Sequence, residues 1–368
     1  MTIDARGVSR VRGGAARAAR SVAFGAICLS GTIAWAQAAP APAGAPAAPA
    51  GSVAVTGAPV PPAPPAAPPP PPYSLPFQLR PIAPGNVFRV DTTYAAYTDP
   101  STQNDGSTVA SMVLASYKVT PNLAPLVRIG FVQNNAPDAG PMAAYPTVSG
   151  NATTNPLLGV LYGRKVDSFR LAGFGAITIP IGGGGGGPPD PTKPGIAGAQ
   201  SQAIAARSGM DNAMFAVNYM TAIVGFGGAY VANKLTIQVE ATLLQLFRTR
   251  GENNLRASND STRTNSTFGV HVGYFFLPML SAGAELRYQR WLSTPTTGAR
   301  NAMTGVVTNT AFADNRMDTL TAAFGPRMHF KIGKTTWIRP GISYAFGIDK
   351  PLTDGSYKMV QLDIPVVF

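Results

Sequence analysis

The sequence predicts an all-β fold: a transmembrane antiparallel up-and-down β-barrel of about 12 strands, preceded by a disordered segment rich in Pro and Ala. Three observations predict it. From residue 86 onward, apolar side chains alternate with small or polar ones. The connections between the alternating segments are short and long in turn. The last segment, 360–368, alternates strictly and ends on Phe368.

The first 36 residues are typical of a signal peptide. Several Arg residues precede an apolar run over 22–35, and small residues at Ala34 and Ala36 mark a cleavage site before Gln37. A membrane-spanning helix is the alternative, but the run is shorter than the roughly 20 residues that a bilayer core requires. The one cysteine, Cys28, lies in this leader, so the mature chain is predicted to form no disulfide.

Residues 37–85 are predicted to form a disordered periplasmic linker. Ala, Pro, Gly and Val dominate the segment, and 68–72 are all Pro. Such a composition buries too little apolar surface to offset its ordering entropy, and Pro favours an extended chain. A docking segment for a periplasmic partner or the cell wall is the alternative function of this stretch.

Residues 86–368 are predicted to form the barrel. An even number of strands places both ends of a barrel on the same side of the membrane, here the periplasm. The twelve predicted strands are 86–97, 107–119, 123–133, 156–164, 168–180, 213–231, 235–249, 266–276, 280–292, 317–332, 336–348 and 356–368.

The short connection at 277–279 predicts a strand register. One face is apolar over 268–276, and the apolar face resumes at Leu280. Pairing 276 with 280 keeps both faces in step, because successive strand residues point to opposite sides. This register places His271 opposite Glu285, and we predict that they form a pair in the lumen.

The long connection 181–212 has an unusual composition. It contains six consecutive glycines at 182–187 and an Ala-rich stretch at 197–207 that predicts a short helix. A phosphate-binding loop would need a Lys-Ser or Lys-Thr pair after the glycines, and there is none. Two alternatives stay open: a flexible surface loop, or a loop that folds into the lumen as a constriction or plug.

The predicted lumen carries more Lys and Arg than Asp and Glu. Basic side chains that line a pore favour the passage of anions, unless they pair with acidic groups across the strands. One strip on two neighbouring strands has no obvious acidic partner and is the predicted basic patch that faces solutes. It consists of Arg327, His329, Lys331 and Arg339.

The sequence predicts no enzyme, no cofactor and no metal site. Only His271 and His329 are present, and neither lies in a cluster with a nucleophile or with further metal ligands. A lipid hydrolase of the outer membrane is therefore the least favoured function. Removal of the predicted leader lowers the net charge from +12 to +8, which is modest for this length and indicates no nucleic-acid partner.

The closing strand with Phe368 resembles the C-terminal signature of bacterial outer-membrane β-barrels. Residues 117–123 and 177–182 are similar to segments of uncharacterised single-chain barrels described as transporter-like or porin-like. The resemblance implies the outer membrane of a Gram-negative bacterium, contact with its lipid, and a barrel assembly machinery that recognises the last strand, with Phe368 as the assembly signal. The expected function is a narrow passive channel for small polar or anionic solutes. A non-conducting structural or surface-interaction barrel is the alternative.

Overall fold

The computed structural model describes residues 73–100, 102–137, 149–183, 195–250, 261–293, 296–300, 307–311, 318–333 and 335–368. The predicted signal peptide and residues 37–72 of the predicted linker lie outside the described residues. No helix in the described ranges has the length and apolar character needed to cross a bilayer.

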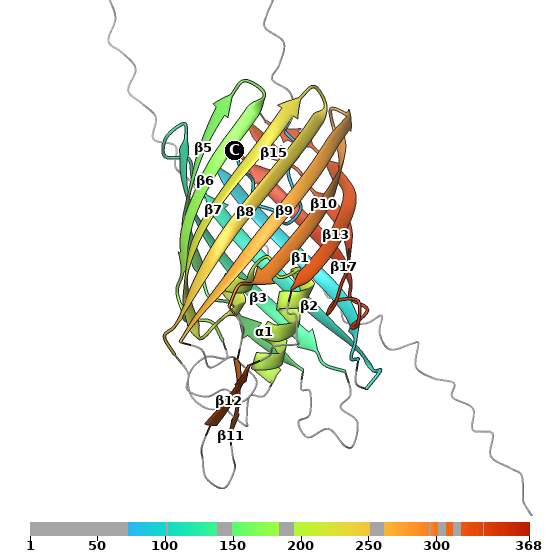
Figure 1. Ribbon diagram of the computed structural model, residues 1–368. Coiled ribbons are helices and arrows are strands. Elements are labelled where there is room, and N and C mark those ends of the chain that lie inside the picture. The colour runs from blue at the N-terminus through green and yellow to red at the C-terminus, as the bar shows by residue number, and fades with distance from the viewer. Residues whose placement is uncertain are drawn as a thin grey trace, which may run out of the picture. The chain divides into compact units, whose positions relative to one another are not determined.

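Within these ranges, twelve antiparallel strands form one barrel, and the first strand pairs with the last (Figure 1). The predicted fold class is confirmed. In spatial order the strands are β1 (Val87–Thr98), β2 (Asp105–Ser116), β3 (Leu123–Asn135), β5 (Leu157–Val166), β6 (Phe169–Thr178), β7 (Tyr219–Ala232), β8 (Leu235–Arg248), β9 (Thr262–Leu277), β10 (Leu280–Trp291), β13 (Thr319–Met328), β16 (Gly341–Gly347) and β17 (Lys358–Val367).

Short strands lie outside the twelve-strand path. β4 (Gly150–Thr153) pairs with β3, whereas β11 (Thr296–Arg300) and β12 (Val307–Ala311) form a separate two-stranded sheet. β14 (Phe330–Ile332) pairs with β15 (Thr336–Ile338), which also pairs with β17.

Two predicted strands are each divided in two. The predicted strand 317–332 becomes β13 and β14, and 336–348 becomes β15 and β16. The ladder is interrupted at His329 and around Pro340, which has no N–H to donate. There the N–H of His329 donates to the carbonyl oxygen of Met279 at 2.9 Å. The N–H of Met328 donates to the carbonyl oxygen of Pro340 at 2.8 Å.

The predicted register between β9 and β10 is confirmed over most of its length. Ser281 lies opposite Phe275, and Glu285 lies opposite His271, as predicted. The turn itself differs, because Leu280 pairs with Leu277 and an irregularity follows before Ser281. The bulge restores the phase in which apolar side chains point outward.

Two helices lie in the long connection between β6 and β7. α1 (Gly195–Ala206) confirms the predicted helix, and α2 (Asn212–Phe215) occupies residues predicted as the start of the next strand. Among the residues buried here are Ala203, Arg207, Met214 and Phe215, so the described part of this connection folds into the barrel. For the described part of this loop, the luminal alternative is the one observed.

The two ends of the barrel differ. The tight connections between β5 and β6, β7 and β8, and β9 and β10 lie at one end, at the top of Figure 1. Helix α1 lies toward the other end, where the long connections are. These are called the short-turn end and the long-loop end below.

Residues 73–85 also lie inside the barrel. Their composition predicts the end of the linker, yet Phe77, Leu79 and Ile82 are buried by the barrel wall and the luminal loop. Residues 73–85 are called the N-terminal segment below.

Candidate functional site

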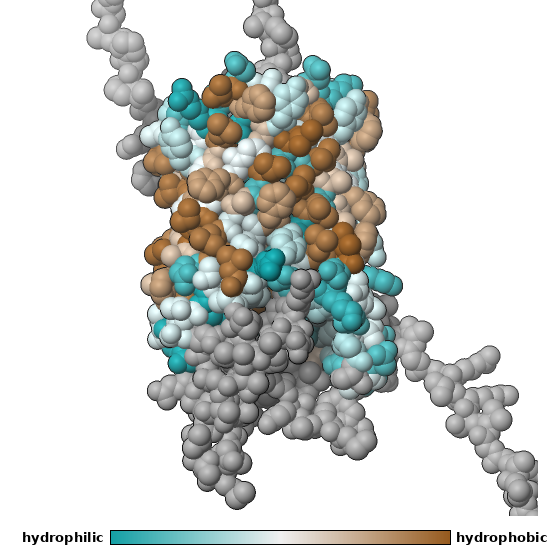
Figure 2. Space-filling model, in the orientation of Figure 1, coloured by the Kyte–Doolittle hydropathy of each residue, from teal (hydrophilic) through white to brown (hydrophobic). Residues whose placement is uncertain are grey.

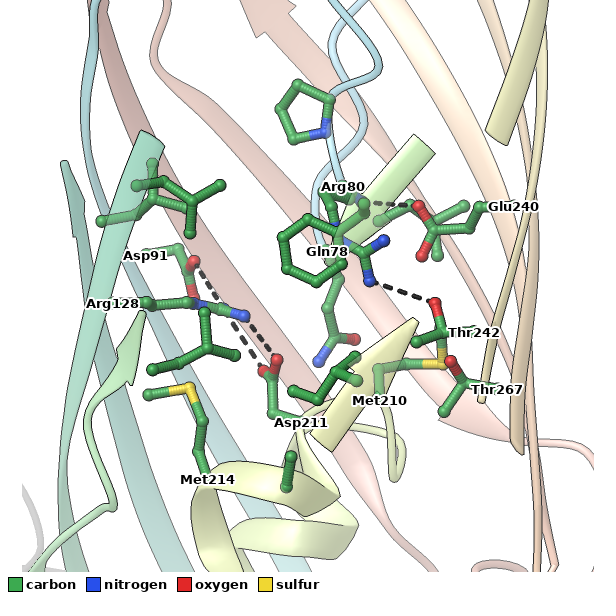
Figure 3. A pocket seen from close by; sticks show the side chains of 18 of the residues that line it. Gln78, Arg80, Asp91, Arg128, Met210, Asp211, Met214, Glu240, Thr242 and Thr267 are labelled. Atoms are coloured by element: carbon green, nitrogen blue, oxygen red, sulfur yellow. Dashed lines mark hydrogen bonds and ion pairs between the residues drawn. The ribbon is translucent and has the colours of Figure 1, made fainter. Parts of the chain in front are cut away.

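The N-terminal segment and the luminal loop meet inside the barrel and leave a cavity of about 70 Å³ between them (Figure 3). A space of this size holds several water molecules. Its lining mixes apolar and polar side chains. The apolar ones include Leu126, Phe174 and Ile223, and the polar and charged ones include Arg80, Arg128, Asp211, Glu240 and Thr242. The cavity is therefore amphipathic.

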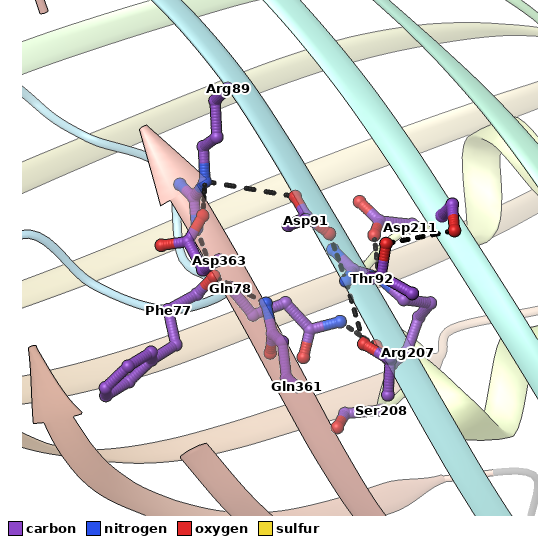
Figure 4. Close-up of polar contacts among 12 residues, drawn as sticks. Phe77, Gln78, Arg89, Asp91, Thr92, Arg207, Ser208, Asp211, Gln361 and Asp363 are labelled. Atoms are coloured by element: carbon purple, nitrogen blue, oxygen red, sulfur yellow. Dashed lines mark hydrogen bonds and ion pairs between the residues drawn. The ribbon is translucent and has the colours of Figure 1, made fainter. Parts of the chain in front are cut away.

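The barrel wall holds the N-terminal segment largely by its main chain. The N–H groups of Phe77 and Gln78 donate to the carboxylate of Glu285, the second at 3.2 Å. The N–H of Arg80 donates to Glu240 Oε2 at 2.8 Å. In the other direction, Gln361 Nε2 donates to the carbonyl oxygen of Phe77 at 2.7 Å (Figure 4).

A buried carboxylate, Asp363, lies between two arginines that also contact this segment. Arg89 Nε donates to Asp363 Oδ1 at 2.6 Å, and Arg327 donates to Oδ2. Arg89 and Arg327 also donate to the carbonyl oxygen of Pro76 at 3.2 and 3.3 Å. Since breaking a buried ion pair leaves an uncompensated charge, this cluster ties the segment to the closing strand β17.

A second charged cluster holds the luminal loop. Arg207 and Asp211, at the end of α1 and before α2, contact Asp91 of β1 and Arg128 of β3. Burial alone would raise the pKa of Asp211, but the charges of Arg128 and Arg207 outweigh it and lower this pKa to about 2. The Asp211 carboxylate is therefore charged at neutral pH.

The remainder of the loop packs on an apolar part of the luminal wall. Met214 and Phe215 of α2 belong to one buried cluster with Leu157, Ile223 and Leu244 from β5, β7 and β8. The lumen thus has an apolar side under α2.

Several wall glycines lie directly against the N-terminal segment. A Cβ atom added at Gly269 would come within 2.4 Å of Leu79, and one at Gly273 within 2.3 Å of the Ser74 Cβ. A Cβ at Gly163 would lie 2.5 Å from Pro84. The wall therefore has room for this segment only because side chains are missing at these positions.

The structure brings the predicted pair together. His271 Nδ1 lies 3.5 Å from Glu285 Oε1, and both side chains are buried. Glu285 also contacts Arg287 Nη2 at 2.6 Å, so the carboxylate has two partners on the wall besides the N-terminal segment.

The residues of the predicted basic strip do not form a single open patch. The prediction that the strip has no acidic partner is wrong for Arg327. Arg327 is buried and paired with Asp363, which the sequence places on the distant closing strand. His329 bonds through Nε2 to Ser281 Oγ at 2.8 Å, Arg339 lies over the ring of Trp337, and Lys331 is exposed on β14.

Serine–histidine contacts occur at two places in the described barrel. Ser74 Oγ lies 3.3 Å from His271 Nε2, and His271 Nδ1 faces Glu285, but all three side chains are buried and Glu285 is also bound by Arg287 and by main-chain N–H groups of the N-terminal segment. The other contact joins Ser281 and His329. A serine hydrolase also needs an acidic or polar group that orients the histidine. The charged side chains beside His329 are Arg327 and Arg339, and its ring packs on Phe275. These neighbours do not support an imidazolium, so the pair is a structural contact of the wall. Among the described residues, no group of three or more His, Cys, Asp and Glu side chains is placed to hold a metal.

Phe368 ends the closing seam. Its N–H donates to the carbonyl oxygen of Asn86 at 3.1 Å, and about half of its surface is exposed. Its side chain is thus not part of the luminal site.

The N-terminal segment was predicted as linker, although its sequence carries a signal of burial. Tyr73, Leu75, Phe77 and Leu79 alternate at the end of the Pro-rich stretch, and all four are buried. This alternation continues the strand-like pattern of the barrel into residues assigned to the linker.

No family model and no curated protein matches the sequence. Among solved structures, an outer membrane channel from Pseudomonas putida F1 is 12% identical with a TM-score of 0.48, covering 79% of this chain and 98% of that one. The KdgM porin is 9% identical with a TM-score of 0.38, covering 76% and 99%. The translocator domain of the autotransporter NalP from Neisseria meningitidis is 11% identical with a TM-score of 0.40, covering 77% and 88%. At this level of similarity, none of the three indicates what this chain binds or transports.

Proposed function

We propose that this protein is a passive channel of the bacterial outer membrane for small polar solutes, including anions, and that the N-terminal segment closes it in the described state. The observation that carries the proposal is a barrel with an apolar exterior and a charged interior that encloses a cavity. A catalytic role is not part of the proposal.

The exterior has the character of a lipid-facing surface. Along β8, the outward residues Ile237, Val239 and Leu243 alternate with the buried residues Gln238 and Glu240. Figure 2 shows apolar residues spread over the middle of the barrel, with more hydrophilic residues toward its two ends. An apolar band of this kind, with polar groups pointing inward, is typical of outer-membrane barrels.

The interior fits a narrow path. Eight-stranded barrels are filled by side chains, and barrels with 16 to 18 strands leave an open aqueous channel, so twelve strands give an intermediate width. Here the remaining space is the cavity between the N-terminal segment and the luminal loop. Removing the N-terminal segment would connect this cavity to the short-turn end.

The preference for anions is weaker than the sequence indicates. Asp363 neutralises part of the charge of Arg89 and Arg327, and Glu285 does the same for Arg287. Arg339 is the member of the predicted strip best placed to attract an anion, since it lies beside Arg327 and Trp337 and forms no ion pair with the residues that the structure describes.

The test is single-channel recording on the full chain refolded into planar bilayers. In one variant, a Gly/Ser segment of equal length replaces residues 73–85, and we expect it to conduct more than the native chain. In a second, Leu79→Cys with Gly269→Cys joins the N-terminal segment to the wall. We expect no current from this variant when oxidised and recovery of native behaviour on reduction. Leu79→Cys alone is the control.

A non-conducting structural barrel is the second candidate, because the lumen is filled from both ends. To allow for the luminal loop, the Gly/Ser variant is also combined with Arg207→Ala and Asp211→Ala. If a folded barrel carries no current in any of these forms, the structural function replaces the channel.

A further inference from the structure

The luminal wall contacts the N-terminal segment through groups that every peptide has. Its acceptors take main-chain N–H groups: Thr236 Oγ1 from Ser74 at 3.0 Å, Glu285 from Phe77 and Gln78, and Glu240 from Arg80. Its donors reach main-chain carbonyl oxygens: Arg89 and Arg327 at Pro76, Gln361 at Phe77, and Gln238 Nε2 at Arg80, the last at 2.8 Å.

These contacts come from opposite sides of the lumen. Thr236, Gln238 and Glu240 are successive inward residues of β8, while Arg89 and Gln361 lie on the paired strands β1 and β17. The segment bends at residues 77–79 and folds back, because Gln238 binds both the Tyr73 hydroxyl and the carbonyl oxygen of Arg80. The site therefore holds a bent main chain between donors and acceptors on both sides. Such a site matches the alternation of N–H and C=O groups in a peptide.

Side chains of the segment add fewer polar contacts. The Tyr73 hydroxyl bonds to Gln238, Arg80 Nη2 bonds to Thr242 Oγ1 at 3.1 Å, and Gln78 reaches the luminal loop. The buried side chains of Leu75, Phe77 and Leu79 fill space and are apolar. Hydrogen bonding is thus directed mostly at the main chain, while the apolar side chains contribute packing.

Two of the wall acceptors are buried carboxylates. Without the N-terminal segment, Glu285 still has Arg287 and His271 as partners on the wall. The hydrogen bond described for Glu240, in contrast, comes from the main chain of the segment. A buried carboxylate without a partner is unfavourable. An emptied site therefore favours a new ligand that presents N–H groups.

From this arrangement we infer that the luminal wall is a binding site for peptides in a bent conformation, and that residues 73–85 are its resident occupant. Another peptide binds when the resident segment leaves, through the same main-chain groups. Transport of such peptides through the barrel rests on the proposed channel function. Their binding to the wall does not depend on it.

The test uses the full chain with the Gly/Ser segment in place of residues 73–85, folded in detergent. A synthetic fluorescent peptide with the sequence of residues 73–85 is the probe, and its anisotropy measures binding. N-methylation of the Phe77 and Arg80 amides removes the two donors without changing any side chain. Because hydrogen bonds to charged groups are the stronger ones, we expect binding to weaken about tenfold or more.

Matched controls distinguish main-chain recognition from nonspecific binding. A peptide with Gln78→Ala keeps all main-chain groups and should bind within about threefold of the original, since it loses one neutral hydrogen bond. On the wall, Glu240→Ala should weaken binding, whereas Gln245→Ala, outside the peptide contacts, should not. Equal binding of the N-methylated and unmodified peptides would overturn the inference, as would displacement of the probe by maltoheptaose at the same concentration.

Current recordings on the same variant keep the two proposals apart. Peptide binding to a folded barrel that carries no current would reject the channel and retain the peptide site. Current without peptide binding would retain the channel and reject the peptide site.

Discussion

Gln78 donates a hydrogen bond from Nε2 to the carbonyl oxygen of Arg207 at 2.6 Å, and this contact joins two segments that enter the lumen from opposite ends. Gln78 belongs to the N-terminal segment, which leads into β1 at the short-turn end. Arg207 follows α1 at the long-loop end (Figure 1). The centre of the lumen is thus closed by a contact between the two segments, in addition to the contacts that each makes with the wall.

Asp363→Asn should destabilise the barrel by about 3 to 5 kcal/mol, because it removes the carboxylate between the buried side chains of Arg89 and Arg327. Urea titration of the refolded protein, followed by tryptophan fluorescence, measures the free energy of unfolding. Asp318→Asn is the control. Its contact with the exposed Arg290 is 3.9 Å long, so it should cost about 1 kcal/mol or less. Similar small costs for both variants would show that the Asp363 cluster contributes little.

Gly273→Val should displace the N-terminal segment, since the new Cβ would lie 2.3 Å from the Ser74 Cβ. Hydrogen exchange of a peptide covering residues 73–85 should become faster, while exchange in the strands stays slow. Gly173→Val makes the same change where no atom lies within 4 Å, and exchange should remain native. Unchanged protection in Gly273→Val would mean that the wall adapts to the extra side chain.

Val239→Arg should cost about 2 to 4 kcal/mol if this outward residue of β8 lies near the bilayer midplane. Val239 lies beside Gly228 and Val270 on the neighbouring strands. Gln245→Arg, near the end of the same strand, should cost about 1 kcal/mol or less. Folding free energies in lipid vesicles measure both. A larger cost at Gln245 would place the apolar band lower on the barrel than proposed.

Phe368→Asp should impair assembly in cells and leave refolding in micelles unchanged. The structural contact described for Phe368 is a main-chain bond to Asn86, which the substitution retains. Heat-modifiable migration on gels measures the folded fraction in both settings. Normal insertion in cells would count against Phe368 as an assembly signal. A loss in micelles would instead indicate a structural role.

The strands could be predicted from the sequence because alternation is a local property. A segment such as 235–248 shows its two faces without reference to any partner, and the short turns then fix the neighbour, as for His271 and Glu285. Charge pairing could not be predicted in the same way. Arg327 and Asp363 come from different strands, and Arg89 joins them only because β1 pairs with β17.

The N-terminal segment was missed for a related reason. Its burial depends on the three-dimensional shape of the barrel wall, which cannot be read from the sequence. Leu79 and Ser74 lie against Gly269 and Gly273, where the wall has no side chains. Proline and alanine before residue 73 also favoured a linker. Because composition predicts a linker up to residue 85, the four alternating apolar side chains at 73, 75, 77 and 79 were predicted as part of the linker.

The order of the contacts along the N-terminal segment has a mechanical consequence. From Tyr73 to Arg80, successive residues meet Gln238, Thr236, Glu285 and Glu240. Traction on the chain before Tyr73 would load these contacts one after another rather than all together, so the segment would peel away under a smaller force than simultaneous rupture needs. Because it stays tethered to β1, it would return to the wall as soon as the tension ended.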